Sequence, residues 1–312
     1  MTKGKILSIG SYNVGFTVST KNMPVWGETI VGKKFFESYG GKGSNQAVAA
    51  KKLGGDVTFI GNLGKDSFGE KGIEMLEEMG VNTEHVIFSD TNTGVGLIIL
   101  NGENDNAIIL DLGANMDITA EDIEKSREVI KESDTIVFQM EISFEAIKRG
   151  MQIANEYDKK VIFNPAPANE KAIELLSLST VINPNESELL ILNGLNPATE
   201  ISKKETIELA RNLLDKGPEA VIVTRGKQET IVITRESEEF VKPISVETVK
   251  DTTGAGDTFT GALAYALTEG LELLEAVRFA NLAGTYTVTR EGVIPALPTL
   301  EKLKKFKTDT VF

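Results

Sequence analysis

The amino-acid sequence predicts an α/β fold in which a central, mostly parallel sheet is flanked by helices and joined by a small β-sheet lid. Six short apolar and β-branched runs recur along the chain: KILSIG, DVTFIG, DTIVFQM, KKVIFNPAP, STVINPN and EAVIVTRG. Helical patterns lie between them, as in ETIELARNLLDKG, where Ile207, Ala210, Leu213 and Leu214 share one face. Apolar strands that alternate with amphipathic helices are typical of a parallel sheet covered on both faces.

Two segments, 12–39 and 93–110, break this alternation. The second contains TGVGLIIL, the turn NGEND and then NAIIL, a hairpin pattern without a helix. We expect both segments to form one small sheet that lies over the main one as a lid. The remaining ranges, 1–11, 40–92 and 111–312, would form the α/β core. The alternative is that the two segments are edge strands of the main sheet.

Composition excludes several classes of protein. The chain has 312 residues, a net charge of −13 and 41% hydrophobic side chains, enough for one large α/β domain or two smaller ones. Without a basic block, a nucleic-acid partner is not expected. The N-terminus leads directly into a strand, and no apolar run reaches the length of a membrane span, so we expect a cytoplasmic protein without a membrane partner.

Few side chains are available for metal or nucleophilic chemistry. The sequence contains no cysteine and one histidine, His85, which we expect at a loop or strand edge. This excludes disulfides, thiolate metal sites and histidine triads. General-base chemistry would therefore fall to carboxylates or lysines.

The stretch DTTGAGDTF predicts a site for an anion. It follows FVKPISVETVKD, which resembles a strand, and it opens the helical pattern TFTGALAYALTEG. Glycine and alanine leave the first, unpaired N–H groups of a helix approachable, and these groups attract negative charge. Asp257 would lie in the first helical turn. A helix-terminal aspartate is common, but this alternative does not explain Gly254, Ala255 and Gly256.

A second glycine-rich stretch, GGKGSNQAVAAKKLG, opens another amphipathic helix. Its polar residues Lys42, Ser44, Asn45 and Gln46 could bind a hydroxyl-rich ligand, although an ordinary helix start is the alternative. The sequence lacks the P-loop motif, and GAGDTF lacks the third glycine of the dinucleotide fingerprint. Both of those nucleotide-binding classes are therefore disfavoured.

In this order and context, the two glycine-rich stretches resemble the signatures of the ribokinase-like (PfkB) family of carbohydrate kinases. The similarity continues through PVWGET, NPAPA, NPNESE, VIVTRG and TREG, and within the family it is closest to the ribokinases. It implies ATP-dependent phosphorylation of a primary hydroxyl of a pentose, D-ribose foremost, to give ribose 5-phosphate. Another sugar or a nucleoside is the alternative substrate. A sugar or nucleotide sensor without turnover is the alternative from a different class.

The resemblance also implies roles for individual residues. Asp257 would take the proton of the attacking hydroxyl, and the amides of Gly254, Ala255 and Gly256 would hold the charge of the transferred phosphoryl group. The positions that match sugar contacts are Asn13, Gly15, Gly41, Lys42, Gly43, Asn45, Glu141 and Asp257. The positions that match the magnesium and nucleotide sites are Asn185, Glu188, Thr224, Gly226, Lys227, Gly256 and Asn281. A turn residue is the alternative for Asn185.

Potassium is the third cofactor that the resemblance implies, beside ATP and Mg²⁺. The matching positions are Asp251, Thr253, Thr287, Arg290, Gly292 and Ala296. The chain departs from the family pattern at Ala296, where a serine is usual, at Glu229, where a glycine is usual, and at Gly15, where an aspartate binds sugar hydroxyls. The resemblance further implies a homodimer formed through the lid.

Overall fold

The computed structural model describes residues 3–101 and 106–310, and its centre is an eight-stranded sheet. The strand order is β14-β13-β12-β11-β10-β9-β1-β4. The strands are β1 (Lys5–Ile9), β4 (Asp56–Ile60), β9 (Thr135–Phe138), β10 (Lys160–Phe163), β11 (Val181–Ile182), β12 (Ala220–Val223), β13 (Thr230–Thr234) and β14 (Glu238–Val241). All neighbours from β4 to β12 are parallel, while β13 and β14 are antiparallel. The predicted fold class is confirmed.

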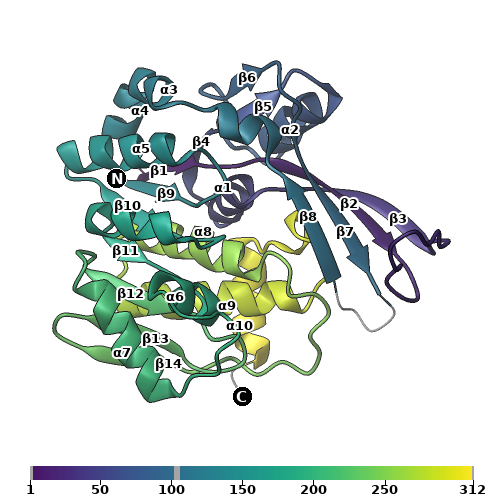
Figure 1. Cartoon of the computed structure of the whole chain (residues 1–312). Helices are drawn as coiled ribbons and strands as arrows, with labels where there is room; N and C mark the ends of the chain where they lie inside the picture. Colours follow the sequence, from purple (N-terminus) through teal and green to yellow (C-terminus); the bar gives the residue numbers. More distant parts are fainter. Residues whose placement is uncertain (1–2, 102–105, 311–312) are drawn as a thin grey trace.

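Helices cover both faces of this sheet (Figure 1). One apolar cluster packs under α1 (Lys42–Lys52), α2 (Ser67–Glu78), α8 (Ala255–Thr268), α9 (Leu273–Val288) and α10 (Leu300–Thr310). The other packs under α3 (Ala120–Lys125), α4 (Arg127–Glu132), α5 (Phe144–Glu156), α6 (Glu186–Leu192) and α7 (Lys203–Leu214). Short 3₁₀ segments lie at η1 (Gly113–Asp117), η2 (Glu170–Leu178) and η3 (Ile294–Ala296). Successive residues of a strand enter opposite clusters, as Ile6 and Leu7 do in β1.

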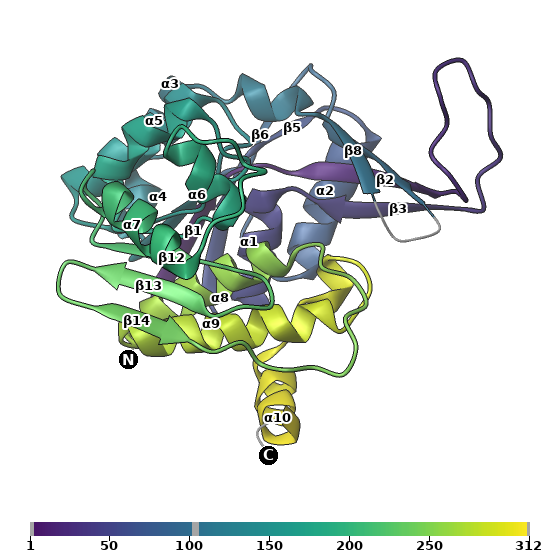
Figure 2. The same ribbon diagram turned by 60° about the horizontal axis from the view of Figure 1, so that its bottom comes forward.

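The two segments that interrupt the α/β alternation form a separate four-stranded sheet, called here the small sheet. It consists of β2 (Asn13–Ser19), β3 (Lys34–Gly40), β7 (Gly94–Leu100) and β8 (Asn106–Asp111), in the order β3-β2-β7-β8. Figures 1 and 2 show it projecting beyond the main body. The alternative of edge strands in the main sheet is therefore wrong. Most of the expected turn NGEND lies outside the described residues. A further two-stranded sheet pairs β5 (Asn62–Gly64) with β6 (Ile87–Ser89).

The prediction of a strand before DTTGAGDTF is largely wrong. Strand β14 ends at Val241, and the residues from there to α8 form a loop that crosses the lower part of the molecule (Figure 2). Pro243 has no N–H to donate to a strand partner, which disfavours a longer strand. The loop therefore brings Asp251 to α9 rather than to the sheet. The N–H of the preceding residue, Lys250, donates to the backbone oxygen of Val288 in α9.

Candidate active site

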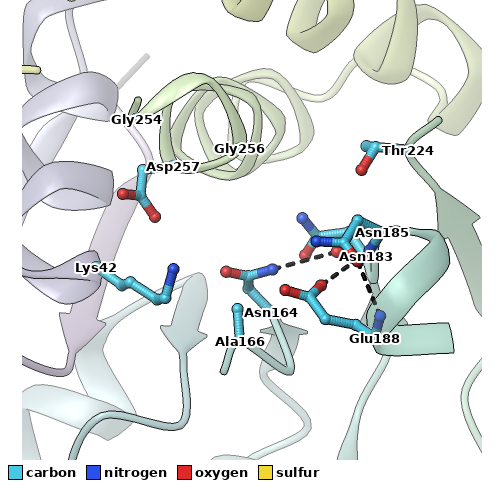
Figure 3. A pocket seen from close by; sticks show the side chains of 10 residues that line it. All are labelled: Lys42, Asn164, Ala166, Asn183, Asn185, Glu188, Thr224, Gly254, Gly256 and Asp257. Carbon is cyan, nitrogen blue, oxygen red and sulfur yellow. Dashed lines mark hydrogen bonds between the residues drawn. The ribbon is translucent and has the colours of Figure 1, made fainter. Parts of the chain in front are cut away.

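A cleft of about 220 Å³ lies where several parallel strands end (Figure 3). Asn164 follows β10, Asn183 begins the segment after β11, and Thr224 follows β12. The carboxyl ends of parallel strands are the usual place for ligands in α/β sheets. The residues that line the cleft are Lys42, Asn164, Ala166, Asn183, Asn185, Glu188, Thr224, Gly254, Gly256 and Asp257.

Helix α8 begins at the wall of this cleft with Gly254 as its N-cap. Gly254 has φ 75°, a left-handed conformation, and a Cβ there would lie 2.6 Å from Cγ1 of Val293. A glycine has no side chain to accept from the first N–H groups of the helix. A Cβ on Gly256 would meet nothing within 4 Å, so the backbone is approachable from the cleft. Ala255 is the first helical residue and is not among the residues that line the cleft.

Asp257 lies in the first turn of α8, and two amides from α1 hold its carboxylate. Asn45 Nδ2 donates to Oδ2 at 2.8 Å, and Gln46 Nε2 donates to Oδ1 at 3.0 Å. Gln46 Oε1 in turn accepts from Gln139 Nε2 at 2.8 Å. Asp257 is buried, but it reaches the cleft. Its carboxylate is therefore fixed in orientation by neutral donors and can still accept a proton from a ligand.

Lys42 is the first residue of α1 and faces Asp257 in the cleft (Figure 3). Burial by itself would lower the pKa of its ammonium group. The negative charges of Asp257, Glu141 and Glu188 outweigh this effect, and the pKa is raised above its ordinary value. Lys42 is therefore a permanent cation that can neutralise part of the charge of a bound phosphate.

Glu141 joins the small sheet to α1. Its Oε2 accepts from Ser11 Oγ at 2.6 Å, from the N–H of Lys42 at 3.1 Å and from Asn13 Nδ2 at 3.4 Å. Asn115, which the sequence analysis missed, donates from Nδ2 to Asn13 Oδ1 at 2.8 Å. The predicted sugar-contacting residues Asn13, Lys42 and Glu141 are therefore neighbours.

Gly41 and Gly43 are required by close packing. Gly41 has φ 91°, and a Cβ there would lie 2.7 Å from Ser11 O. A Cβ on Gly43 would lie 2.5 Å from the nitrogen of Ser11. Both glycines let α1 approach the segment after β1, whether or not they also contact a ligand.

Asn185 and Glu188 line the other side of the cleft and cap α6. The side chain of Asn185 accepts from the N–H of Glu188, and Glu188 Oε2 accepts from the N–H of Asn185, both at 2.8 Å. Burial raises the pKa of the Glu188 carboxyl, and the charge of Asp257 adds to this. The N–H of Asn185 and the charge of Lys42 act in the opposite direction, but the pKa stays above its ordinary value.

The remaining predicted nucleotide positions are spread more widely. Thr224 lines the cleft, whereas Gly226, Lys227 and Asn281 are not among the described residues that line it. Gly226 has φ 58° in the turn after β12, and Asn281 donates to Lys242 O at 3.1 Å. Glu229, which departs from the family pattern, pairs with Lys203 at 2.6 Å and so anchors this turn.

Three of the predicted potassium positions, Asp251, Thr253 and Gly292, contact one another near the start of α8. Asp251 accepts from the N–H groups of Thr253 at 2.9 Å and Gly292 at 3.0 Å. The Thr287 hydroxyl is buried and donates to Thr258 Oγ1, and the backbone oxygen of Thr287 accepts from the N–H of Arg290 at 3.0 Å. The guanidinium of Arg290 lies over the Tyr286 ring. Ala296 is buried and offers no hydroxyl.

One lysine lies close to this region. Lys52 Nζ donates to Ile294 O at 2.9 Å, so one carbonyl beside the predicted positions already has a positive partner. In the described part of the chain, no group of three or more His, Cys, Asp or Glu side chains gathers to hold a metal ion. A bound monovalent cation would therefore rest mainly on carbonyl oxygens and Asp251.

The family model described as "pfkB family carbohydrate kinase" matches residues 3–300. The chain belongs to the pfkB family of carbohydrate kinases. The family resemblance seen in the motifs is thereby confirmed, and with it the prediction that the chain is a sugar kinase.

Individual members of the pfkB family match over almost the whole chain. It is 36% identical to "Ribokinase" of Haemophilus influenzae, covering 96% of both chains. It is 34% identical to "Deoxyribokinase" of Salmonella typhi, covering 96% of this chain and 98% of the relative. Among solved structures, Arabidopsis thaliana ribokinase complexed with ribose and ATP is similar with a TM-score of 0.88 and 28% identity. The match covers 98% of this chain and 99% of that one.

Other features of this pfkB protein were missed by the sequence analysis. Asn164 and Asn183 begin NPAPA and NPNESE, yet neither was singled out. Asn183 Nδ2 donates to Thr260 Oγ1 at 2.7 Å, and Asn164 Oδ1 accepts from Gln46 at 3.1 Å. Their place directly after predicted strands was the signal that could have found them. A membrane-crossing helix would need a longer apolar run than any helix among the described residues provides.

Proposed function

We propose that the chain transfers the γ-phosphate of ATP to a primary hydroxyl of a pentose, D-ribose foremost, giving ribose 5-phosphate. The observation that carries this proposal is the carboxylate of Asp257, fixed by Asn45 and Gln46 in the first turn of a glycine-capped helix. The relatives named ribokinase and the similar structure complexed with ribose and ATP support the choice of substrates.

In the proposed reaction, Asp257 accepts the proton of the sugar hydroxyl. The hydroxyl oxygen bonds to the γ-phosphorus, the bond from that phosphorus to the bridging oxygen breaks, and ADP leaves. The backbone N–H groups of Gly254, Ala255 and Gly256 would hold the charge on the transferred oxygens. Gly254 and Gly256 line the cleft, and Lys42 adds a positive charge there. Little more is needed, because positioning and electrostatics supply most of the catalysis in phosphoryl transfer.

We place Mg²⁺ and the nucleotide on the opposite side of the cleft. Glu188 and Asn185 present oxygen atoms of the kind that Mg²⁺ prefers, and both line the cleft. When bound, Mg²⁺ neutralises phosphate charge. Thr224, Gly226, Lys227 and Asn281 would border the nucleotide. Gly226 and Lys227 follow β12, which ends at the cleft.

Potassium is a further part of the proposal. The residues Asp251, Thr253, Thr287, Arg290, Gly292 and Ala296 would surround it, mainly through backbone oxygens. Support comes from the contact between Val293 and Gly254, which couples this region to the start of α8. Activity in KCl well above that in NaCl of equal ionic strength is the expected result, and equal activity in both salts would remove potassium from the proposal.

We also propose that the small sheet, 12–39 and 93–110, is a lid over the sugar, hinged on the core ranges 1–11, 40–92 and 111–312. Closure of such a lid excludes water that would otherwise compete for the phosphoryl group. The contact of Asn13 with Glu141 supports this, because it ties β2 to the site.

The same sheet is proposed to form a homodimer contact. Phe35, Leu97 and Ile109 share one of its faces and are 62%, 48% and 68% exposed. Exposed apolar patches of this kind mark interaction surfaces. Light scattering after size-exclusion chromatography should give the mass of a dimer, and Ile109→Lys should reduce it toward that of a monomer. A monomeric wild type at micromolar concentration would contradict this.

One second candidate has specific support, namely a kinase for 2-deoxyribose. The Salmonella typhi relative named deoxyribokinase is 34% identical, and Gly15 stands where an aspartate would bind a sugar hydroxyl.

The absence of cysteine is compatible with the expected cytoplasmic location, which remains a prediction.

The test is ADP release in the presence of Mg²⁺ and K⁺ across pentoses, hexoses, 2-deoxyribose and nucleosides. Ribose is expected to give the highest catalytic efficiency. A higher efficiency for 2-deoxyribose would favour the second candidate. No ADP release with any sugar or nucleoside would revive the sensor without turnover.

A further inference from the structure

The small sheet carries few side chains in the row of residues that contains Gly15. Gly15 pairs with Ser38 on β3 and with Gly96 on β7, and Gly96 pairs with Leu110 on β8. Residues directly opposite one another in neighbouring strands point to the same face of a sheet. The row across the four strands is therefore Ser38, Gly15, Gly96 and Leu110. Ser38 is the one polar side chain in this row.

This row shares its face with Asn13. Residues two apart in a strand point to the same side, so Gly15 follows Asn13 on that face. Asn13 contacts Glu141, and Glu141 accepts from the N–H of Lys42, which lines the cleft. The row thus continues the site from Asn13 along the small sheet.

The hydroxyl of Ser38 stands where the side chain of residue 15 would begin. A Cβ on Gly15 would lie 2.6 Å from Ser38 Oγ and 3.4 Å from Cδ1 of Ile98. The Ser38 hydroxyl donates to Gly15 O at 3.4 Å, which is long for a bond between two oxygen atoms. Ser38 is half-buried. A hydroxyl has one proton to donate and two lone pairs to accept with, so most of its capacity is available to a ligand.

We propose that Ser38 is a specificity-determining residue whose hydroxyl binds the sugar hydroxyl that faces the small sheet. This inference rests on the proposed function. Chemically, a neutral side chain from β3 would take over a position where an acidic side chain on β2 is usual in the family. A neutral hydrogen bond contributes less than one to a charged group. The site would therefore bind that sugar hydroxyl, but discriminate less strongly against a sugar that lacks it.

A purely structural role for Ser38 is the competing explanation. Its hydroxyl could serve the pairing of β2 with β3 through Gly15 O. Ser19 provides a matched control, because it lies farther out on the same face and its hydroxyl also donates to a backbone carbonyl, Lys34 O at 3.5 Å. Replacing either serine by alanine removes one such bond from the same sheet.

The first experiment compares Ser38→Ala with Ser19→Ala on ribose, 2-deoxyribose and 3-deoxyribose. Loss of one neutral hydrogen bond should raise the KM for ribose about three- to tenfold in Ser38→Ala, with kcat and the KM for ATP unchanged. The increase should disappear for the deoxy sugar that lacks the partner hydroxyl. Ser19→Ala should match the wild type. The same increase with all three sugars, no increase with ribose, or an equal increase in Ser19→Ala would overturn the proposal.

The second experiment uses the steric overlap at residue 15. Gly15→Ala places a methyl group on the Ser38 hydroxyl and should displace it, raising the KM for ribose about as much as Ser38→Ala does. In the double variant Gly15→Ala with Ser38→Ala, the two effects should not add, because the same bond is lost once. Additive effects would show that Gly15 and Ser38 act separately, and would contradict the proposal.

Failure of this inference can be told apart from failure of the proposed function. If no sugar promotes ADP release by the wild type, the kinase assignment fails. Calorimetric titration of ribose into wild type and Ser38→Ala then still tests the contact, since weaker binding by the variant alone would support it and equal binding would overturn it.

Discussion

Two regions of the molecule are rich in glycine: the junction of α1 with α8, and the row around Gly15 in the small sheet. Glycine allows close packing in the first and leaves open space in the second. At the junction, a Cβ on Gly261 of α8 would lie 2.5 Å from Gln46 O of α1, so the helices touch through glycine. There the amides of Asn45 and Gln46 are committed to Asp257. Around Gly15, glycine leaves space that a single serine hydroxyl partly fills. Under the proposed function, the junction carries the chemistry and the small sheet selects the sugar.

The largest expected effect comes from breaking the junction at Asp257. Asp257→Asn keeps the shape of the side chain but removes the proton acceptor, so kcat should fall about a hundredfold or more. Steady-state ADP release measures this, with thermal unfolding and ATP binding as controls that should stay close to wild type. Turnover within threefold of wild type would remove Asp257 from the catalytic role.

A pair of glycines at the start of α8 separates backbone strain from access to the cleft. Gly254→Ala forces a left-handed residue to carry a Cβ that lies 2.6 Å from Val293, so it should destabilise the fold by roughly 1–3 kcal/mol. Gly256→Ala should fold normally, because its Cβ meets nothing within 4 Å. Its methyl group would obstruct phosphate, however, and lower kcat about tenfold or more. Chemical denaturation and kinetics check the two effects. Equal stability of both variants with wild type would refute the strain argument.

An intermediate effect is expected where the small sheet is made to resemble the family pattern. Gly15→Asp alone places its Cβ against Ser38 Oγ, so its benefit should be small. With Ser38→Ala in addition, the aspartate can bind the sugar through a charged hydrogen bond, and catalytic efficiency on ribose should exceed that of the wild type about tenfold. A wild type that already binds ribose with micromolar affinity would count against a weakened sugar site.

The smallest expected effect concerns the pH dependence of Mg²⁺ activation. The pKa of Glu188 is raised mainly by burial, so this carboxyl becomes protonated at a higher pH than an ordinary glutamate does. Once protonated it no longer attracts a cation, and the Mg²⁺ concentration for half-maximal activity should rise a few-fold as the pH falls through that pKa.

Glu188→Gln is the control for this prediction. It should show weak Mg²⁺ activation that no longer changes with pH in that range. If the Mg²⁺ activation of the variant still depended on pH as it does in the wild type, the titration would belong to another group.

Part of the site could be read from local sequence. The start of α8 at DTTGAGD was predicted because glycine before a polar helix start is a local signal, and the structure places Gly254 as the N-cap. The contacts of Asp257 could not be predicted, since its partners Asn45 and Gln46 lie more than 200 residues earlier in the chain. The strand expected in FVKPISVETVKD was wrong beyond Val241, because apolar alternation alone does not supply a neighbouring strand.

The sequence by itself determined the α/β class, the separate pairing of the two interrupting segments and the pfkB family, because periodicity and short motifs are local properties of the chain. The tertiary structure alone decided which side chains meet. It brought the Ser38 hydroxyl beside Gly15, and it formed the hydrogen bonds from Asn115 to Asn13 and from Lys52 to Ile294 O. Strand order, register and the close approach of helices at glycine set these contacts, and they depend on the packing of the whole chain rather than on any one segment of it.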